Sequence, residues 1–126
     1  MTEILFSSSF DEKNPPNNIF SSSTSQFWSS TGLYPQELDM ALNSVKTISE
    51  IQIIGYNIKS LMIEICENDS AAIFKVQYEQ NNIPQKDKSL QTINCQLNSK
   101  ATSKIIKLTI LEGHKDFCTI HNILFK

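Results

Sequence analysis

The chain has 126 residues, a formal net charge of −2 and a hydrophobic content of 40%. This length fits one domain with its own core, and the hydrophobic content excludes a disordered chain. All 11 basic residues are Lys, and they are outnumbered by acids. The chain therefore lacks the basic surface by which proteins bind nucleic acids or anionic lipids, and we expect a single domain over residues 1–126.

The N-terminal residues and the cysteines predict a cytoplasmic location. Glu3 stands where a signal peptide has a cation, and the longest apolar run, residues 71–74, is far too short to span a membrane. The cysteines are Cys66, Cys95 and Cys118. Their odd number and wide spacing favour reduced, buried thiols over a disulfide framework or a zinc knuckle.

Short segments of period-two alternation follow one another along the chain and are rich in β-branched and aromatic residues, as half-buried strands are. A turn is expected at Asn43 and Ser44. Strands spaced about ten residues apart predict an all-β sandwich or barrel made of antiparallel sheets. The segments cover residues 3–6, 38–42, 51–56, 61–66, 73–79, 93–97, 105–111 and 119–125.

The alternation also predicts which side chains face solvent. The polar residues of these strands belong on the wet faces, and they are Glu64, Lys75, Gln77, Lys107 and Thr109. Two strands are apolar on both faces, which favours coverage by another element or by a protein partner. The side chains that we predict to contact a partner are Met62, Cys66, Ile105 and Leu111.

The segment over residues 7–34 has little alternation and is rich in Ser, Asn and Pro, interrupted by aromatic residues. We expect an ordered loop that plugs one end of the sandwich, with Trp28 in the core. A Trp could instead be a stacking platform for a sugar. Gly32 is expected in a turn at positive φ. Residues 11–19 read Asp-Glu-Lys-Asn-Pro-Pro-Asn-Asn-Ile, residues 27–28 Phe-Trp, and residues 31–37 Thr-Gly-Leu-Tyr-Pro-Gln-Glu.

This pattern resembles the discoidin-like, galactose-binding-like jelly roll and, more narrowly, the intraflagellar transport protein 25 family. The likeness extends through Glu64 and returns weakly near residues 117–123, whereas residues 70–103 have no assigned counterpart. The residues that carry it are Pro15, Pro16, Asn18, Ile19, Phe27, Trp28 and Gly32.

The resemblance implies a β-sandwich subunit of the intraflagellar transport B complex in cilia or flagella. It also implies a heterodimer with a Rab-like small GTPase, intraflagellar transport protein 27, and no catalysis. A carbohydrate-binding module on the same fold is the alternative. A third possibility is a substrate-receptor module, as in the related anaphase-promoting-complex subunit fold.

Calcium-binding members of the family carry an Asp-Gly-Asn triplet where this chain has Ser21, Ser22 and Ser23. No carboxylate occurs between Lys13 and Glu37. Calcium prefers six to eight oxygen ligands, and carboxylates set its affinity. We therefore expect no metal site and no other cofactor.

The remaining candidate groups have structural explanations. His114 and His121 are expected to be hydrogen-bonded structural residues, because no acidic pattern completes a catalytic or metal site around them. Asp11 and Glu12 are adjacent residues of an exposed turn, which usually point apart rather than act as an acid–base pair.

Overall fold

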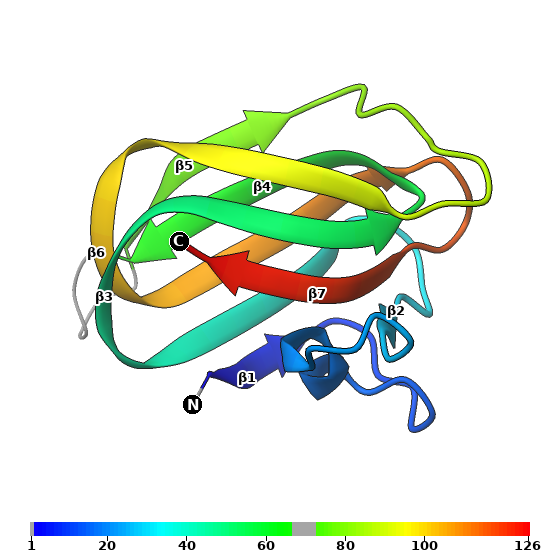
Figure 1. Ribbon diagram of the computed structural model, residues 1–126, viewed down its shortest axis with the longest axis horizontal. Helices are drawn as coiled ribbons and strands as arrows, with labels where there is room; N and C mark the ends of the chain where they lie inside the picture. The colour runs from blue at the N-terminus through cyan, green and yellow to red at the C-terminus, as the bar shows by residue number, and fades with distance from the viewer. Residues whose placement is uncertain (1, 67–72) are drawn as a thin grey trace.

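The computed structural model describes residues 2–66 and 73–126, except for the side chains of residues 43, 45, 46 and 99–104. It confirms an all-β fold with antiparallel pairing between strands (Figure 1). The strands are β1 (Glu3–Ser7), β2 (Trp28–Ser29), β3 (Gln36–Tyr56), β4 (Ile58–Cys66), β5 (Phe74–Gln80), β6 (Gln91–Gly113) and β7 (Thr119–Phe125), and a single 3-10 turn, η1, covers Pro16–Phe20.

Two long strands replace four of the short strands predicted from the sequence. The segments 38–42 and 51–56 are the two halves of β3, and the segments 93–97 and 105–111 are the two halves of β6. Asn43 and Ser44, where a turn was expected, lie within β3. The β3–β6 register shifts between Ala41 and Lys46, so an irregularity within the long strand replaces the expected turn.

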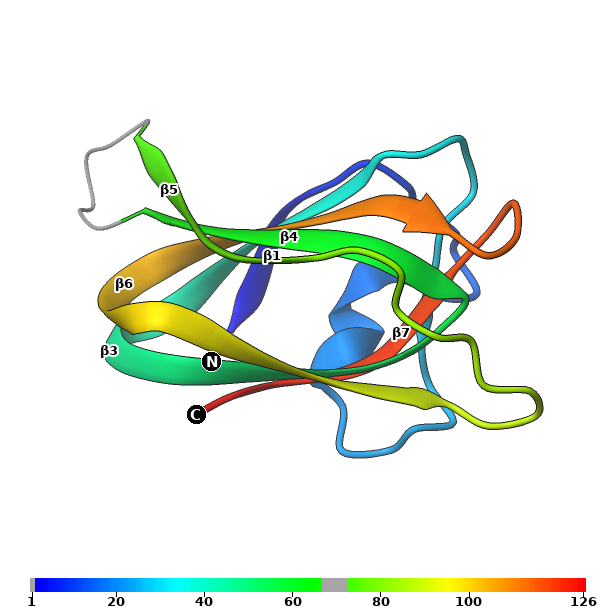
Figure 2. The same ribbon diagram turned by 90° about the horizontal axis from the view of Figure 1, so that it is seen from above.

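The long strands bend at one end of the molecule and thereby contribute to two layers (Figures 1 and 2). The first layer contains β1, the N-terminal half of β3, the C-terminal half of β6, β4 and β5. The second layer contains β2, β7, the C-terminal half of β3 and the N-terminal half of β6. The result is a β-sandwich in which the layers share two strands.

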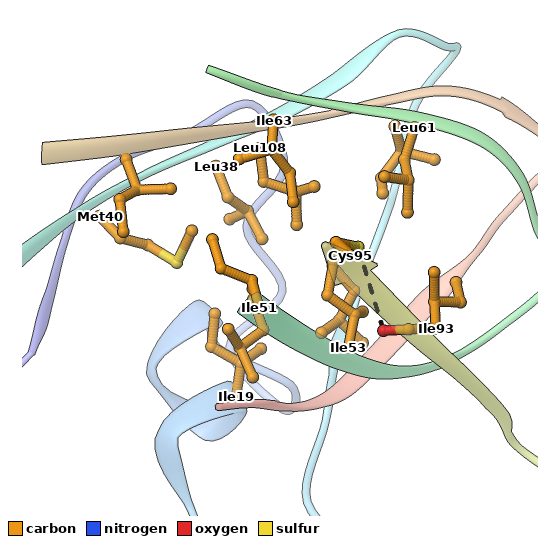
Figure 3. Packing of buried hydrophobic residues seen from close by; sticks show 14 of the residues in the cluster. Ile19, Leu38, Met40, Ile51, Ile53, Leu61, Ile63, Ile93, Cys95 and Leu108 are labelled. Carbon is orange, nitrogen blue, oxygen red and sulfur yellow. Dashed lines mark hydrogen bonds between the residues drawn. The ribbon is translucent and has the colours of Figure 1, made fainter. Parts of the chain in front are cut away.

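The core lies between the layers and is built from the inward side chains of each strand (Figure 3). Leu38, Leu61 and Ile63 of the first layer face Ile53 and Ile93 of the second, and all five are buried. Burial of such a side chain stabilises the fold by about 1.5–3 kcal/mol. Alternation over much of β3, β4 and β6 therefore determines which face of each strand is covered.

The predicted alternation is wrong in β5. Gln77 is only 5% exposed and Val76 is 47% exposed, the reverse of what was expected. The β4–β5 register shifts between Ile63 and Glu64, and this irregularity exchanges the two faces of β5. Thr109, also expected on a wet face, is buried at 8% exposure.

The irregular segment closes one end of the sandwich, as predicted. Trp28 is fully buried, and its Nε1 donates to the carbonyl oxygen of Ser9 at 3.2 Å. Asn18 Nδ2 donates to the carbonyl oxygen of Phe27 at 3.0 Å. Pro16 and Ile19, on η1, are also buried. The motif residues are thus held by packing and by side-chain bonds to backbone oxygens.

Gly32 departs from its expected conformation. The structure gives no glycine a positive φ among the described residues, and the left-handed positions are Asn57, Asn82 and Lys88. The turn after Gly32 is closed by Gln36, whose Nε2 donates to the carbonyl oxygen of Leu33 at 2.7 Å. A side-chain bond therefore stabilises this turn without a left-handed residue.

Candidate partner-binding face

One row of side chains crosses the outer face of the first layer. Phe6 pairs with Asp39, Asp39 with Lys107, Lys107 with Glu64, and Glu64 with Val76. Residues directly opposite each other in a ladder share a face of the sheet. We call these five residues the Lys107 row. It brings together, from five strands, groups that are far apart in the sequence.

The charges of the Lys107 row do not balance. Asp39 has the carboxyl groups of Glu37 and Glu64 nearby, and Lys107 is the cation beside them. Partial burial, a hydrogen bond to Glu37 and the negative charge of Glu37 together raise the pKa of Asp39 to about 6, although Lys107 acts against this. Asp39 Oδ1 is buried and has no hydrogen-bond partner among the described residues.

Apolar side chains surround these charges. Phe6 and Val76 are each about half exposed, at 50% and 47%. The ammonium of Lys107 lies 4.4 Å from the ring centroid of Phe74. Exposed apolar groups beside charges are typical of protein interfaces, where large side chains and cations meet a partner.

The structure places three of the four predicted partner contacts at the surface of this layer. Cys66 and Ile105 are direct cross-strand partners, but Cys66 is only 1% exposed and so offers a partner little surface. Met62, Ile105 and Leu111 are half-buried. Phe6 and Val76, which the sequence did not identify, are more accessible. Phe6 lies in the predicted strand over residues 3–6, and this is the signal that the sequence offers for it.

We call the loop with Ser21, Ser22 and Ser23, which corresponds to the family's calcium loop, the serine loop. It is attached to β7. His121 Nδ1 lies 2.6 Å from the carbonyl oxygen of Thr24, and Asn122 Nδ2 donates to that of Ser21 at 2.7 Å. The loop supplies hydroxyl and carbonyl oxygens but no carboxylate, so its donors do not fit a tight calcium site. Among the described residues, no group of three or more His, Cys, Asp or Glu side chains is arranged so that it could hold a metal ion.

The histidines and thiols have structural roles. His114 Nε2 lies 2.7 Å from the carbonyl oxygen of Ile83, and His121 bonds as described above, so both predictions are confirmed. All three cysteines are buried, and none of them forms a disulfide. Burial raises the pKa of Cys95 to about 12 and that of Cys118 to about 11, which keeps both thiols protonated and unreactive.

The Asp11 carboxylate accepts hydrogen bonds from the backbone N–H of Lys13, at 3.0 Å, and from Asn14 Nδ2. These bonds lower the pKa of Asp11. Both bonds are local, within the exposed turn, so Asp11 holds this turn in place. This geometry gives it no partner for acid–base chemistry on a substrate.

The proteins that resemble this chain in sequence are intraflagellar transport proteins. The chain is 32% identical over 120 residues to intraflagellar transport protein 25 of Chlamydomonas reinhardtii, covering 95% of this chain and 62% of that protein. It is 25% identical over 122 residues to the mouse intraflagellar transport protein 25 homolog, covering 97% of this chain and 84% of the relative. The chain thus spans less than two thirds of the algal protein. No family model matches it.

Solved structures share the fold. A family 32 carbohydrate-binding module from Clostridium perfringens NanJ, in complex with galactose, has a TM-score of 0.82 at 16% identity, covering 98% of this chain and 92% of the module. A second C. perfringens family 32 module has a TM-score of 0.81. Among the described residues, no helix is long and apolar enough to cross a membrane. The chain is therefore similar in sequence to intraflagellar transport protein 25 over 95% of its length, and it has a galactose-binding-like jelly-roll fold.

Proposed function

We propose that the chain is a non-catalytic subunit of the intraflagellar transport B complex that acts in cilia or flagella and in the cytoplasm. Its partner is a Rab-like small GTPase, intraflagellar transport protein 27, held as a heterodimer. The observation that carries this proposal is the 32% identity to intraflagellar transport protein 25 over 95% of the chain. The Lys107 row and the apolar residues beside it form the contact surface.

The chemistry of this surface supports protein binding. Phe6 and Val76 would lose their water on contact, which is the main favourable term in association. The carboxyl groups of Asp39 and Glu64 would meet donors of the partner, and pairing them in the interface favours one orientation of docking. Lys107 is held over Phe74 and is thus partly ordered before binding.

Co-expression with the GTPase from the same cell tests the proposal. The two proteins are expected to co-elute from a size-exclusion column, and calorimetry is expected to give a micromolar or tighter dissociation constant. Elution of two folded, separate proteins would refute the partner assignment.

A matched pair of variants tests the surface. Val76→Asp is expected to weaken binding at least about tenfold, because a charge would enter an apolar contact. Leu124→Asp is the control, since Leu124 is 45% exposed against 47% for Val76 and lies on the second layer. Equal effects of the two substitutions on binding would show that the partner docks elsewhere.

Carbohydrate binding remains a second candidate because the galactose complex shares the fold. Trp28 is fully buried and cannot be its platform. A surface cavity of about 380 Å³ offers another platform in Tyr56, with Lys88, Ser89 and Thr119 among its lining. Titration with galactose, followed by the fluorescence of the chain and by calorimetry, tests this candidate. Saturable binding that Tyr56→Ala abolishes would support it, and the absence of binding would refute it for this sugar.

A further inference from the structure

The N-terminal half of β6 is an edge of the second layer. Residues 91–96 pair with β3, from Gln91 opposite Gly55 to Gln96 opposite Glu50. β4 pairs with β6 only from Ile105 onward. On its other side, this half of β6 has no strand among the described residues, and Figure 1 shows it in yellow at the margin of its layer. We call the free side of residues 91–97 the β6 edge.

Three other edges of the sandwich carry features that prevent strand addition. β5 has the exposed charges Lys75 and Glu79 and a register irregularity. β1 has Glu3 and a register shift between Ile4 and Phe6. β2 is only two residues long. Charges, irregular register and shortness are the usual means by which proteins protect the edges of their sheets.

The β6 edge has none of these protections. Residues 89–99 contain no charge, no Pro and no Gly. The ladder from residue 91 to residue 96 is continuous, and the exposure of side chains alternates strictly through residue 98. A regular, uncharged strand of this kind is a ready template for another strand, because its backbone N–H and C=O groups on the free side lack partners.

A surface cavity of about 300 Å³ lies beside this edge. Its walls combine Gln80 of β5, in the first layer, with residues 91–94 of β6, in the second, so it opens where the two layers meet. Lys86 is the ionisable residue in its lining. Within the described part of the chain, Lys86 has no ion pair. Gln91 is fixed, since its Nε2 donates to the carbonyl oxygens of Ile58 and Pro84.

We propose that the β6 edge binds an extended peptide segment of a partner protein as an added strand, and that the cavity receives an acidic side chain of that segment. Backbone hydrogen bonds supply the affinity, and the cavity with Lys86 supplies the selectivity. This site lies on a different layer from the Lys107 row, so it does not depend on the function proposed above.

Titration of the ¹⁵N-labelled chain with a short designed peptide tests the proposal. The probe is acetyl-Thr-Val-Thr-Glu-Thr-Val-Thr-amide, matched in length to residues 91–97. Amide resonances of residues 91–97 are expected to shift in a saturable way at peptide concentrations up to about 1 mM. Amides of β1 (Glu3–Ser7), which does not line the cavity, are the internal control and are expected to remain unchanged.

Two further comparisons separate backbone pairing from charge. A peptide with N-methyl groups on alternate residues is expected to lose binding, because it cannot donate to the edge. A peptide with Gln in place of Glu is expected to bind about two- to fivefold more weakly, as for a partly exposed ion pair. The Lys86→Gln chain is expected to bind the Glu and Gln peptides equally.

Three results would overturn the proposal. They are the absence of shifts at residues 91–97, shifts that persist with the N-methylated peptide, and sedimentation that shows the edge already occupied by a second copy of the chain. A Glu preference that survives in Lys86→Gln would overturn the assignment of the cavity.

Discussion

The usual roles of loops and sheets are reversed between two regions of this molecule, the irregular segment over residues 8–34 and the outer face of the first layer. Loops commonly carry function on a rigid scaffold. Here the side chains of the loop are the better buried and hydrogen-bonded ones. Trp28 is buried, and Ser9 and Ser30 bond to backbone groups across the chain. Among the described residues, the regular sheet has one buried carboxylate oxygen, on Asp39, without a hydrogen-bond partner, and it exposes about half of Phe6 and Val76. Regular secondary structure alone therefore does not show which groups are already paired or buried within the chain and which are left for a partner.

The largest effect is expected from Trp28→Ala in the irregular segment. The substitution leaves a cavity and removes the donor to Ser9, which should lower the free energy of unfolding by about 3–5 kcal/mol. Urea denaturation measures it. Phe10→Ala is the control, because Phe10 lies in the same segment but is 66% exposed, and its loss should cost less than about 0.5 kcal/mol. Similar losses in both variants would contradict a buried plug.

Ser30→Ala should have the next largest effect. Ser30 Oγ accepts the backbone N–H of Cys118 at 2.9 Å in a buried position, so its removal leaves that donor unpaired. A loss of about 1–3 kcal/mol in the free energy of unfolding is expected. Ser22→Ala, at an exposed position of the same segment, should be nearly neutral. A neutral Ser30→Ala would mean that water replaces the hydroxyl.

On the sheet face, Asp39→Asn should stabilise the free chain. The pKa of Asp39 is about 6 in the folded state against an ordinary value of 3.8, so the folded chain holds this proton more tightly than the unfolded chain. The wild type should therefore lose stability as the pH rises from about 4 to about 6. Asp39 is only half-buried, and screening by water reduces the expected gain of the variant to about 1 kcal/mol at pH 7.

Thermal unfolding at pH 4 and pH 7 checks this prediction. The advantage of Asp39→Asn should be present at pH 7 and should be largely lost near pH 4, where the folded state is protonated and the unfolded state is about half protonated. Glu12→Gln removes the same charge from an exposed loop and controls for net charge. An advantage of equal size at both pH values would show that the charge of Asp39 is not its cause.

The smallest effect is expected from calcium. Because the serine loop has no carboxylate, exchanging chelator for about 1 mM calcium should move the melting temperature of the chain by less than about 1 °C. A variant with Ser21→Asp, Ser22→Gly and Ser23→Asn restores the family triplet and should gain a calcium-dependent increase. A clear increase in the unmodified chain would contradict the prediction.

The strands and the plug could be predicted from the sequence because both depend on local patterns. Alternation identified most of the inward side chains of β4 and β6, although not the burial of Thr109, and the aromatic residues marked Trp28 as core. The single long β3 could not be predicted, since the pairing with β6 resumes at Lys46 only after a register shift that no local pattern shows. The exposure of Val76 was also missed, because a register irregularity against β4 sets it.

The candidate site was predictable only in part for the same reason. Met62 and Ile105 were noticed because their strands are apolar on both faces. The environment of Asp39 depends on Lys107 and Glu64, which reach it from β6 and β4. No local pattern joins these residues, whereas Glu37, two positions away on the same strand, was the one signal available in sequence.

The strands shared by both layers also determine an expected order of assembly. In the β3–β6 ladder, Gly55 and Gln91 are the paired residues closest in sequence, and Gln36 and Ile110 are the farthest apart. Closing the shorter loop costs less chain entropy. We therefore expect pairing to begin at residues 55 and 91, in the second layer, and to extend toward residues 36 and 110. The second layer would then form before the first and nucleate it.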